Sequence, residues 1–386
     1  SPQLLEIWGL AALDPSHPCL QRLKLGTTGF WKNLIQEQTM SASDQPETGS
    51  RFPQLGRREL LAYSAMFGTS FLASQGLIDK ADAAEKKQDV APPSGKRYDM
   101  KKSINMWAFP YPDKMSLFEC FDLAADAGFD AIEANYDPDG TISPDASEAD
   151  LKRIGDEARK RGIEISGVCS FLFWPYALTS NDPERRAKGR ELAGKMVHAA
   201  KALGTENLLV VPGAVYIPWD PEPEPVPNDL CYERAREAIA GVLPVAEKLG
   251  ISLNMENIFA NGFLLSPQEM NAFVDSFGSD HVQIHFDTGN IMQFQFPEHW
   301  IDICGKRIKN VHLKEYSKKA GTEFTLESFR PLLDGTTNWP AVLEAFDRVG
   351  YRGYLTFEYF HPYPHWPEAL VYQTSDSLDR MLGRKA

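Results

Sequence analysis

From about residue 100 onward, short apolar runs alternate with longer segments that have the periodicity of amphipathic helices. Most of the helical segments end immediately before a glycine, the residue that most readily adopts the left-handed conformation that terminates a helix. A helix that closes on glycine and leads into a short apolar strand is the repeating unit of parallel β/α folds. This alternation constrains the fold more than any other feature of the chain.

Eight apolar runs are predicted to be β-strands: residues 103–107, 131–134, 164–168, 207–211, 252–255, 282–286, 308–312 and 354–358. Helices are predicted between them, over residues 115–127, 149–161, 183–203, 232–249, 267–277 and 339–349. Eight strands over about 285 residues favour a single (β/α)8 TIM barrel of the α/β class over a doubly wound sheet. No G-x-G-x-x-G follows the first strand, and no phosphate-loop or nucleophile-elbow pattern is present.

The first hundred residues lack this alternation. Residues 1–83 are predicted to be a leader outside the core, in which Arg57 and Arg58 precede a moderately apolar stretch and a small-residue cleavage motif near Ala83. Such a pattern is typical of a Tat-type export signal, and an ordinary amphipathic helix beside an arginine pair is the alternative. Residues 84–99 are predicted to be a polar Pro/Gly linker, and residues 100–386 the barrel.

An export signal predicts a periplasmic protein, and without one the chain would be cytoplasmic. Met40 is an alternative first residue, in which case residues 1–39 are an upstream extension. No apolar run reaches the roughly 20 residues that a membrane-spanning helix needs without polar interruption. Five scattered cysteines, none in a C-x-x-C pair, predict buried thiols rather than a disulfide framework.

The charge of the chain argues against one class of partner. Forty Lys and Arg residues against 53 Asp and Glu residues give a net charge of −13. That sign repels phosphate backbones and anionic membranes, so we expect a small-molecule substrate and no nucleic-acid partner. A homo-oligomer is left open.

The last four predicted strands each end in a residue that can bind a metal ion or transfer a proton: Glu256, Asp287, His312 and Glu358. The active site of a TIM barrel lies at the carboxyl ends of its strands, so these four side chains are expected to converge at one mouth. Three carboxylates and one imidazole form an oxygen-rich site for one divalent cation. Mn2+ or Mg2+ is favoured, with Co2+ or Zn2+ as the alternative, and four solvated loop charges are the other interpretation.

Four stretches resemble the xylose isomerase-like sugar phosphate isomerase/epimerase superfamily. They are residues 282–290 (VQIHFDTGN), 309–314 (KNVHLK), 333–342 (LDGTTNWPAV) and 350–358 (GYRGYLTFE). This superfamily of TIM barrels includes the D-tagatose 3-epimerase, hydroxypyruvate isomerase and inosose dehydratase branches. The resemblance covers roughly residues 100–380.

The resemblance implies that the metal quartet of the family falls on Glu256, Asp287, His312 and Glu358. In the epimerase branch the first and last glutamates also exchange the substrate proton, so Glu256 and Glu358 are implied to be catalytic. A cation polarises the substrate oxygens while a carboxylate on each face removes or returns a proton. The chain is thus expected to be a divalent-metal-dependent isomerase or epimerase of a small sugar or keto-sugar that acts through a metal-stabilised enediolate.

Four further residues are candidates for substrate binding. The epimerase branch has His three residues after the aspartate, where this chain has Asn290, and Arg six residues after the metal histidine, where it has Lys318. Both departures count against a sugar 3-epimerase. Glu133 matches the acidic position of the family at the end of the second strand, with a structural salt bridge as the alternative. Lys314 shares the facing of His312, so either the substrate or a metal-binding carboxylate is its expected partner.

Other functions stay open at this point. A metal-dependent lyase or dehydratase would share the fold and the enolate chemistry. An AP endonuclease-like hydrolase is disfavoured by the net charge and by a total of only eight histidines, and a non-catalytic sugar-binding barrel by the intact quartet. His285 is expected to be a core histidine with its hydrogen bonds satisfied rather than a ligand. The proline-rich segment 216–229 is either a lid or a surface feature.

Overall fold

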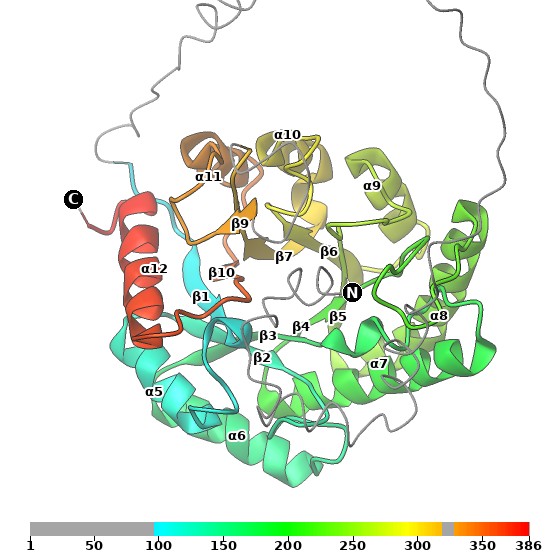
Figure 1. Ribbon diagram of the computed structural model, residues 1–386, viewed down its shortest axis with the longest axis horizontal. Coiled ribbons are helices and arrows are strands. Elements are labelled where there is room, and N and C mark those ends of the chain that lie inside the picture. The colour runs from blue at the N-terminus through cyan, green and yellow to red at the C-terminus, as the bar shows by residue number, and fades with distance from the viewer. Residues whose placement is uncertain (1–95, 319–327, 386) are drawn as a thin grey trace, which may run out of the picture. The chain divides into compact units, whose positions relative to one another are not determined.

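A computed structural model of the chain describes residues 96–318 and 328–385 (Figure 1). Within these residues, eight parallel strands close into one barrel in the order β1-β10-β7-β6-β5-β4-β3-β2. The strands are β1 (Lys101–Asn105), β2 (Ala131–Asn135), β3 (Glu164–Cys169), β4 (Asn207–Val210), β5 (Ser252–Glu256), β6 (Val282–Asp287), β7 (Ile308–Leu313) and β10 (Tyr354–Phe357). The predicted barrel is confirmed, and each predicted strand overlaps an observed one.

Eight α-helices in the described residues surround the barrel (Figure 1). They are α5 (Leu117–Asp126), α6 (Glu148–Lys160), α7 (Pro183–Leu203), α8 (Asn228–Leu249), α9 (Pro267–Asp275), α10 (Pro297–Cys304), α11 (Trp339–Arg348) and α12 (Pro367–Met381). Helix α7 has its predicted bounds because Asp182 caps its first turn and Gly204 ends it with a φ of 88°. The sequence interpretation omitted α10 and α12. Pro297 and Pro367 stand at their starts, but the N-cap residues, Phe296 and Trp366, make no capping hydrogen bond, so the capping part of the start signal is missing.

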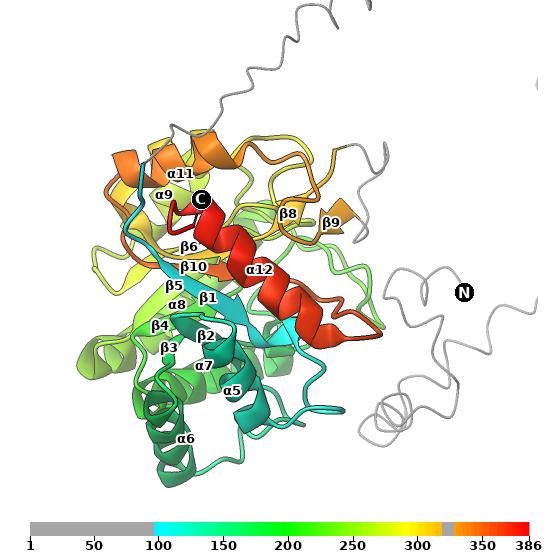
Figure 2. The same cartoon turned by 90° about the vertical axis from the view of Figure 1, so that its left-hand side faces the viewer.

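The last helix packs against the first strand. Figure 2 shows α12 lying across the outside of β1. Lys102 of β1 is buried there, with its ammonium 2.7 Å from Asp379 Oδ1 and 2.9 Å from Ser375 Oγ. Because β1 also pairs with β10, the two ends of the barrel domain are joined both through the sheet and through this helix.

A two-stranded hairpin follows β7. It consists of β8 (Glu315–Tyr316) and β9 (Phe329–Arg330), which pair antiparallel. The buried carboxylate of Glu315 accepts hydrogen bonds from the backbone of Leu333 at 3.1 Å, from Thr337 Oγ1 at 2.6 Å and from the indole of Trp339 at 2.6 Å. This carboxylate therefore holds the segment that leads into α11, one of the four segments that carry the sequence resemblance.

The apolar core lies between the strands and the helices, whereas the barrel interior is polar. Phe286 of β6, for example, stacks on Trp300 of α10 with ring centroids 6.0 Å apart. Inside the barrel, Asn254 Nδ2 donates to Asn207 Oδ1 at 3.2 Å, and the Ser103 and Ser166 hydroxyls lie 2.8 Å apart. Branched apolar side chains usually fill this space, so the polar filling is a departure from the usual interior of a TIM barrel.

Several predictions fall on residues outside the described part of the chain. They are the twin arginine at Arg57 and Arg58, the cleavage motif near Ala83 and the linker up to residue 95. Among the residues that are described, every helix is too short or too polar to cross a membrane.

Candidate metal centre

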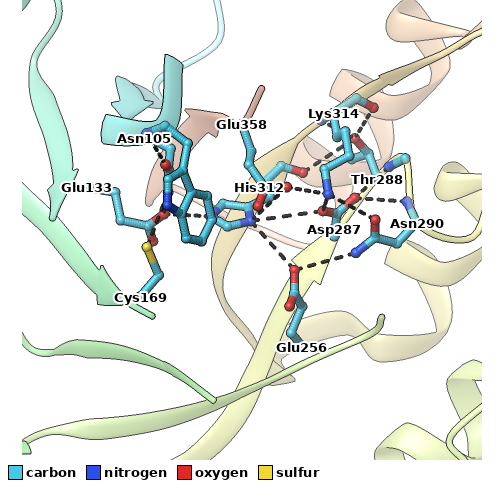
Figure 3. Close-up of polar contacts among 12 residues, drawn as sticks. Asn105, Glu133, Cys169, Glu256, Asp287, Thr288, Asn290, His312, Lys314 and Glu358 are labelled. Carbon is cyan, nitrogen blue, oxygen red and sulfur yellow. Dashed lines mark hydrogen bonds and ion pairs between the residues drawn. The ribbon is translucent and has the colours of Figure 1, made fainter. Parts of the chain in front are cut away.

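The four residues predicted at strand ends converge at the mouth of the barrel (Figure 3). Glu256 and Asp287 are the last residues of β5 and β6, His312 lies near the end of β7, and Glu358 follows β10 directly. One ligand atom of each side chain lies within 4.8 Å of those of the other three, and all four residues are buried. The parallel strands thus place one nitrogen and three oxygen donors around a common centre.

The imidazole of His312 presents one nitrogen to this centre. Its Nδ1 atom lies 3.5 Å from Glu358 Oε2, 3.7 Å from Glu256 Oε1 and 3.9 Å from Asp287 Oδ2. Within the described structure Nδ1 has no hydrogen-bond partner. The other ring nitrogen, Nε2, is 2.6 Å from Glu133 Oε2. Because that carboxylate accepts the Nε2 proton, Nδ1 is the atom available to a ligand in the centre.

The two oxygens of the Asp287 carboxylate also have different surroundings. Its Oδ1 atom accepts the backbone N–H groups of Gly289 at 2.8 Å and of Asn290 at 2.9 Å, which fixes the turn after β6. Its Oδ2 atom accepts no hydrogen bond from the described residues and faces the centre. Asn257 supports the strand end, because its amide donates to the Asp287 carbonyl at 2.8 Å and accepts from the Asp287 N–H at 2.9 Å.

Lys314 brings a positive charge to the edge of the quartet. Its Nζ atom lies 3.0 Å from Asp287 Oδ2 and 3.0 Å from Asn290 Oδ1, and it forms an ion pair with Glu358. The amide group of Asn290 in turn donates to Glu256 Oε1 at 3.4 Å. Two of the predicted substrate-binding residues, Asn290 and Lys314, are therefore part of the same cluster as the quartet.

Glu133 lies beneath His312, fully buried, and its observed contact is the ion pair with that ring. Asn105 of β1 donates to the same carboxylate oxygen at 2.7 Å. The sequence predicted either substrate binding or a structural salt bridge for Glu133, and the observed contact with His312 is of the salt-bridge kind. Asn105 and Asn257 were not identified from the sequence, although both stand at strand ends, as the quartet does.

Two other residues considered from the sequence, Lys318 and His285, make different contacts. The ammonium of Lys318 lies 3.8 Å from the centroid of the Phe296 ring. Among the contacts of the described residues, none joins it to the quartet. His285 is buried as expected, but the expectation that its hydrogen bonds are satisfied is wrong for the described residues, because neither ring nitrogen has a partner. Its ring packs instead on that of His312, with centroids 4.1 Å apart.

The charges within the cluster shift its protonation equilibria in opposite directions. Burial raises the pKa of Glu256, and burial together with Glu358 raises the pKa of Asp287 to about 7, against the influence of Lys314. Burial alone would raise the pKa of Glu358 too, but Lys314 and His312 lower it well below its ordinary value. Burial alone would lower the pKa of His312, but the surrounding carboxylates raise it well above its ordinary value.

The donor set fits a divalent cation. His312 Nδ1 is buried without a hydrogen bond in the described structure, and Asp287 Oδ2 and Glu358 Oε2, which face the same point, share the ammonium of Lys314. A buried ring nitrogen without a partner and three carboxylates beside one ammonium carry a free-energy cost, which a cation bound between them would reduce. Three oxygens and one nitrogen suit Mn2+, Mg2+ and Zn2+ alike, so the donors leave the identity of the metal open.

Two groups of aromatic rings lie in segments that follow barrel strands. Trp107, Phe171 and Phe360 form one group, in which the Trp107 ring lies 4.2 Å from Phe171 and 5.2 Å from Phe360. Trp219 and Phe259 stack at 5.7 Å and 9°. The proline-rich segment lines a cavity of about 330 Å³ together with the loop after β3, and none of the quartet residues lines it.

The family model described as xylose isomerase-like TIM barrel matches residues 121–381. The chain is 27% identical to an L-ribulose 3-epimerase of Mesorhizobium japonicum over 238 residues, 61% of this chain and 72% of that protein. It is 26% identical to a D-psicose 3-epimerase of Agrobacterium fabrum over 245 residues, 62% of this chain and 78% of that protein.

Two solved structures have the same fold. A D-psicose 3-epimerase in the presence of D-fructose gives a TM-score of 0.61 at 21% identity, covering 74% of this chain and all of the other (100%). An IOLI protein with a binding zinc atom gives a TM-score of 0.61 at 17% identity, covering 74% of this chain and 99% of the other. With the family model matching well over half of its residues, the chain belongs to the xylose isomerase-like TIM barrel family.

Proposed function

We propose that this protein is a divalent-metal-dependent isomerase or epimerase of a small sugar or keto-sugar. The observation that carries the proposal is the buried convergence of Glu256, Asp287, His312 and Glu358 on one centre. The similarity to an L-ribulose 3-epimerase and a D-psicose 3-epimerase supports sugar chemistry. Glu256, Asp287, His312 and Glu358 would hold the ion, which supplies Lewis acidity toward the carbonyl and hydroxyl oxygens of the substrate.

The two glutamates are suited to opposite roles in proton transfer. They come from β5 and β10 and reach the centre from opposite sides (Figure 3). One of them removes the proton next to the carbonyl as a general base, and the other returns a proton to carbon, so that together they serve both faces of the substrate. The C–H electron pair becomes the C=C bond of an enediolate, and negative charge moves to the carbonyl oxygen. Return of a proton to carbon from the other glutamate completes the transfer.

Lys314 and Asn290 are placed to contact substrate oxygens beside the quartet. Both are buried at the mouth and joined by a 3.0 Å hydrogen bond. Asn290 is a neutral amide and cannot supply a proton at neutral pH, so we assign it to orientation rather than to acid catalysis. Asn290 and Lys318 stand where the epimerase branch has His and Arg, which counts against a sugar 3-epimerase. A metal-dependent lyase or dehydratase, in which the enediolate expels a leaving group instead of being reprotonated, is therefore kept as the second candidate.

Metal analysis and solvent exchange test the proposal. The purified protein is expected to hold about one divalent ion, which Glu256→Gln and Asp287→Asn reduce while the exposed control Glu237→Gln keeps it. Ketoses and 3-keto sugars incubated in deuterated water are then followed by NMR. Deuterium at carbon without loss of substrate mass supports an isomerase or epimerase, and loss of water or carbon supports the lyase. Full metal content in both quartet variants contradicts the metal site.

We propose in addition that the protein is exported. The basis is the sequence alone, in which Arg57 and Arg58 precede a mild apolar stretch over residues 60–77 and a small-residue cleavage motif near Ala83. Fractionation of cells that express the full chain should give a shortened periplasmic form. Replacing both arginines by lysine should leave the protein in the cytoplasm, and equal export of this variant contradicts a twin-arginine signal.

A further inference from the structure

Lys314 is a buried cation that lies beside a site for another cation. Its residue is 2% exposed, and its ammonium contacts Asp287 Oδ2, Asn290 Oδ1 and Glu358 Oε2. The two carboxylate oxygens are the same atoms that face the centre of the quartet. Asp287 and Glu358 would also be ligands of a divalent ion held by the quartet, which would compete with Lys314 for these oxygens. Of the three partners of the ammonium, Asn290 is the one outside the quartet.

Neighbouring residues fix the position of the Lys314 side chain. The backbone N–H of Lys314 donates to Thr288 Oγ1 at 3.0 Å, and a Cβ at Gly289 would meet the Lys314 Cβ and Cγ at 2.9 Å, so the turn after β6 lies against the side chain. The rings of Phe329 and Phe360 flank Nζ at 4.8 and 5.1 Å. These contacts keep the charge at the mouth rather than in bulk water.

Charge balance then indicates what the loaded site binds. Three carboxylates and one divalent ion leave a single negative charge, which would repel an anionic ligand, and the ammonium of Lys314 cancels it. Glu133 lies on the other side of the His312 ring, where it keeps its charge and accepts hydrogen bonds from Nε2–H and from Asn105, so it is not counted among the groups around the ion. A buried ammonium that loses its carboxylate partners is costly unless another anion replaces them.

On the basis of the proposed function, we infer that Lys314, positioned by Asn290, forms an anion subsite beside the metal quartet. The substrate class is a keto-sugar acid that carries its carboxylate next to the keto group, rather than a neutral ketose. The keto oxygen then lies at the quartet while the carboxylate takes the place of Asp287 and Glu358 at the ammonium.

A matched pair of ligands tests this inference. D-Fructose and 2-keto-D-gluconate differ only in the oxidation of C1 from hydroxymethyl to carboxylate. Calorimetric titration of the Mn2+-loaded protein should show the acid binding about 10- to 100-fold more tightly than the ketose, the range expected for a charge-assisted hydrogen bond. Lys314→Gln should lose most of that preference, whereas Lys314→Arg, which retains the charge, should keep it. Because the two ligands are compared within each variant, the contribution of the ammonium to the preference is separated from chelation of the metal by the ligand.

The possible outcomes separate the inference from the function beneath it. A wild-type preference for the acid of less than about threefold overturns the anion subsite, and this result needs no variant to fold. An equal preference in wild type and Lys314→Gln, with metal content intact, overturns the role of Lys314. If the loaded protein nevertheless exchanges the C–H protons of neutral ketoses with solvent, the proposed function stands. A protein that holds no metal ion contradicts both.

Discussion

The Nε2 atom of His312 lies 2.6 Å from the Oε2 atom of Glu133, although the two residues are 179 positions apart in the sequence. Both side chains are fully buried, and Asn105 donates to the same oxygen at 2.7 Å. Carboxylates bonded to a histidine in this way fix its tautomer and its ring orientation and increase its basicity as a ligand. Glu133 thus determines that Nδ1 is the nitrogen offered to the quartet centre.

Replacing Glu133 by glutamine should weaken metal binding without removing a ligand. The amide retains the shape of the side chain but not its charge, so the ring of His312 is held less firmly and is less basic. We expect about a 10- to 100-fold loss of affinity for Mn2+, measured by competition with a chelator of known affinity. The exposed Glu237→Gln variant is the control for an equal change in net charge. Unchanged affinity in Glu133→Gln would exclude the orienting role.

Metal affinity should rise with pH through 7 and above it, because the pKa of the ligand His312 is also raised well above its ordinary value. The pKa of Asp287 is raised to about 7 by burial and by the neighbouring carboxylates, and that of Glu256 is raised too, so protons compete with the ion at lower pH. Each proton released on binding makes the affinity fall by about tenfold per pH unit below that value. Calorimetry in buffers of different ionisation enthalpy counts these protons directly. Affinity that is constant between pH 5.5 and 7.5 would contradict this prediction.

The metal-free protein should show the opposite trend in stability. In the folded state Asp287 holds its proton up to about pH 7, whereas its ordinary pKa is 3.8. The folded chain therefore binds more protons than the unfolded chain between these values, and the free energy of unfolding falls as pH rises through this window. Urea titrations of the chelated protein at pH 4.5 and 7 measure the difference, and Asp287→Asn should reduce it. An equal pH dependence in that variant would assign the trend to other groups.

Lys314→Met should destabilise the metal-free protein much more than the loaded one. Without the ammonium, Asp287 and Glu358 lose their cationic partner, and breaking a buried ion pair on one side costs about 3–5 kcal/mol. A divalent ion replaces the lost charge, so added Mn2+ should restore most of the melting temperature. The matched control is Lys102→Met, which breaks the buried pair with Asp379 away from the mouth. Metal should not rescue that variant, and equal behaviour of the two would refute the local explanation.

The strands and the quartet could be predicted because both follow from periodicity along the chain. In a parallel barrel every strand ends at the same mouth, so a ligand at the end of an apolar run is placed by topology alone. Glu256 and Asp287 satisfy this rule as the last residues of β5 and β6. Helices α10 and α12 were missed because the aromatic residues at their N-caps give no start signal.

The contacts that support the quartet could not be predicted in the same way. The partner of Glu133 is set by the closure of β1, β2 and β7 into one barrel, and no local pattern encodes which strand lies opposite another. Lys314 and Lys318 follow His312 in the same stretch of sequence, yet only the first reaches the quartet, because the hairpin of β8 and β9 begins between them. Register after a strand end depends on such irregular segments, which sequence periodicity does not describe.

Gly289→Ala should disturb the centre through the backbone, without replacing a side chain of the quartet. A Cβ there would lie 2.8 Å from the carbonyl oxygen of Lys314, backbone that cannot move freely, so the turn after β6 must shift. That turn supplies the N–H groups that fix Asp287 Oδ1. We expect about 1–3 kcal/mol of destabilisation and weaker metal binding, measured by urea unfolding and chelator competition. Gly194→Ala on α7, where a Cβ meets nothing within 4 Å, should instead stabilise the protein by about 0.5–1 kcal/mol. If both variants change the free energy of unfolding in the same direction, the packing of the turn against Lys314 does not control the site.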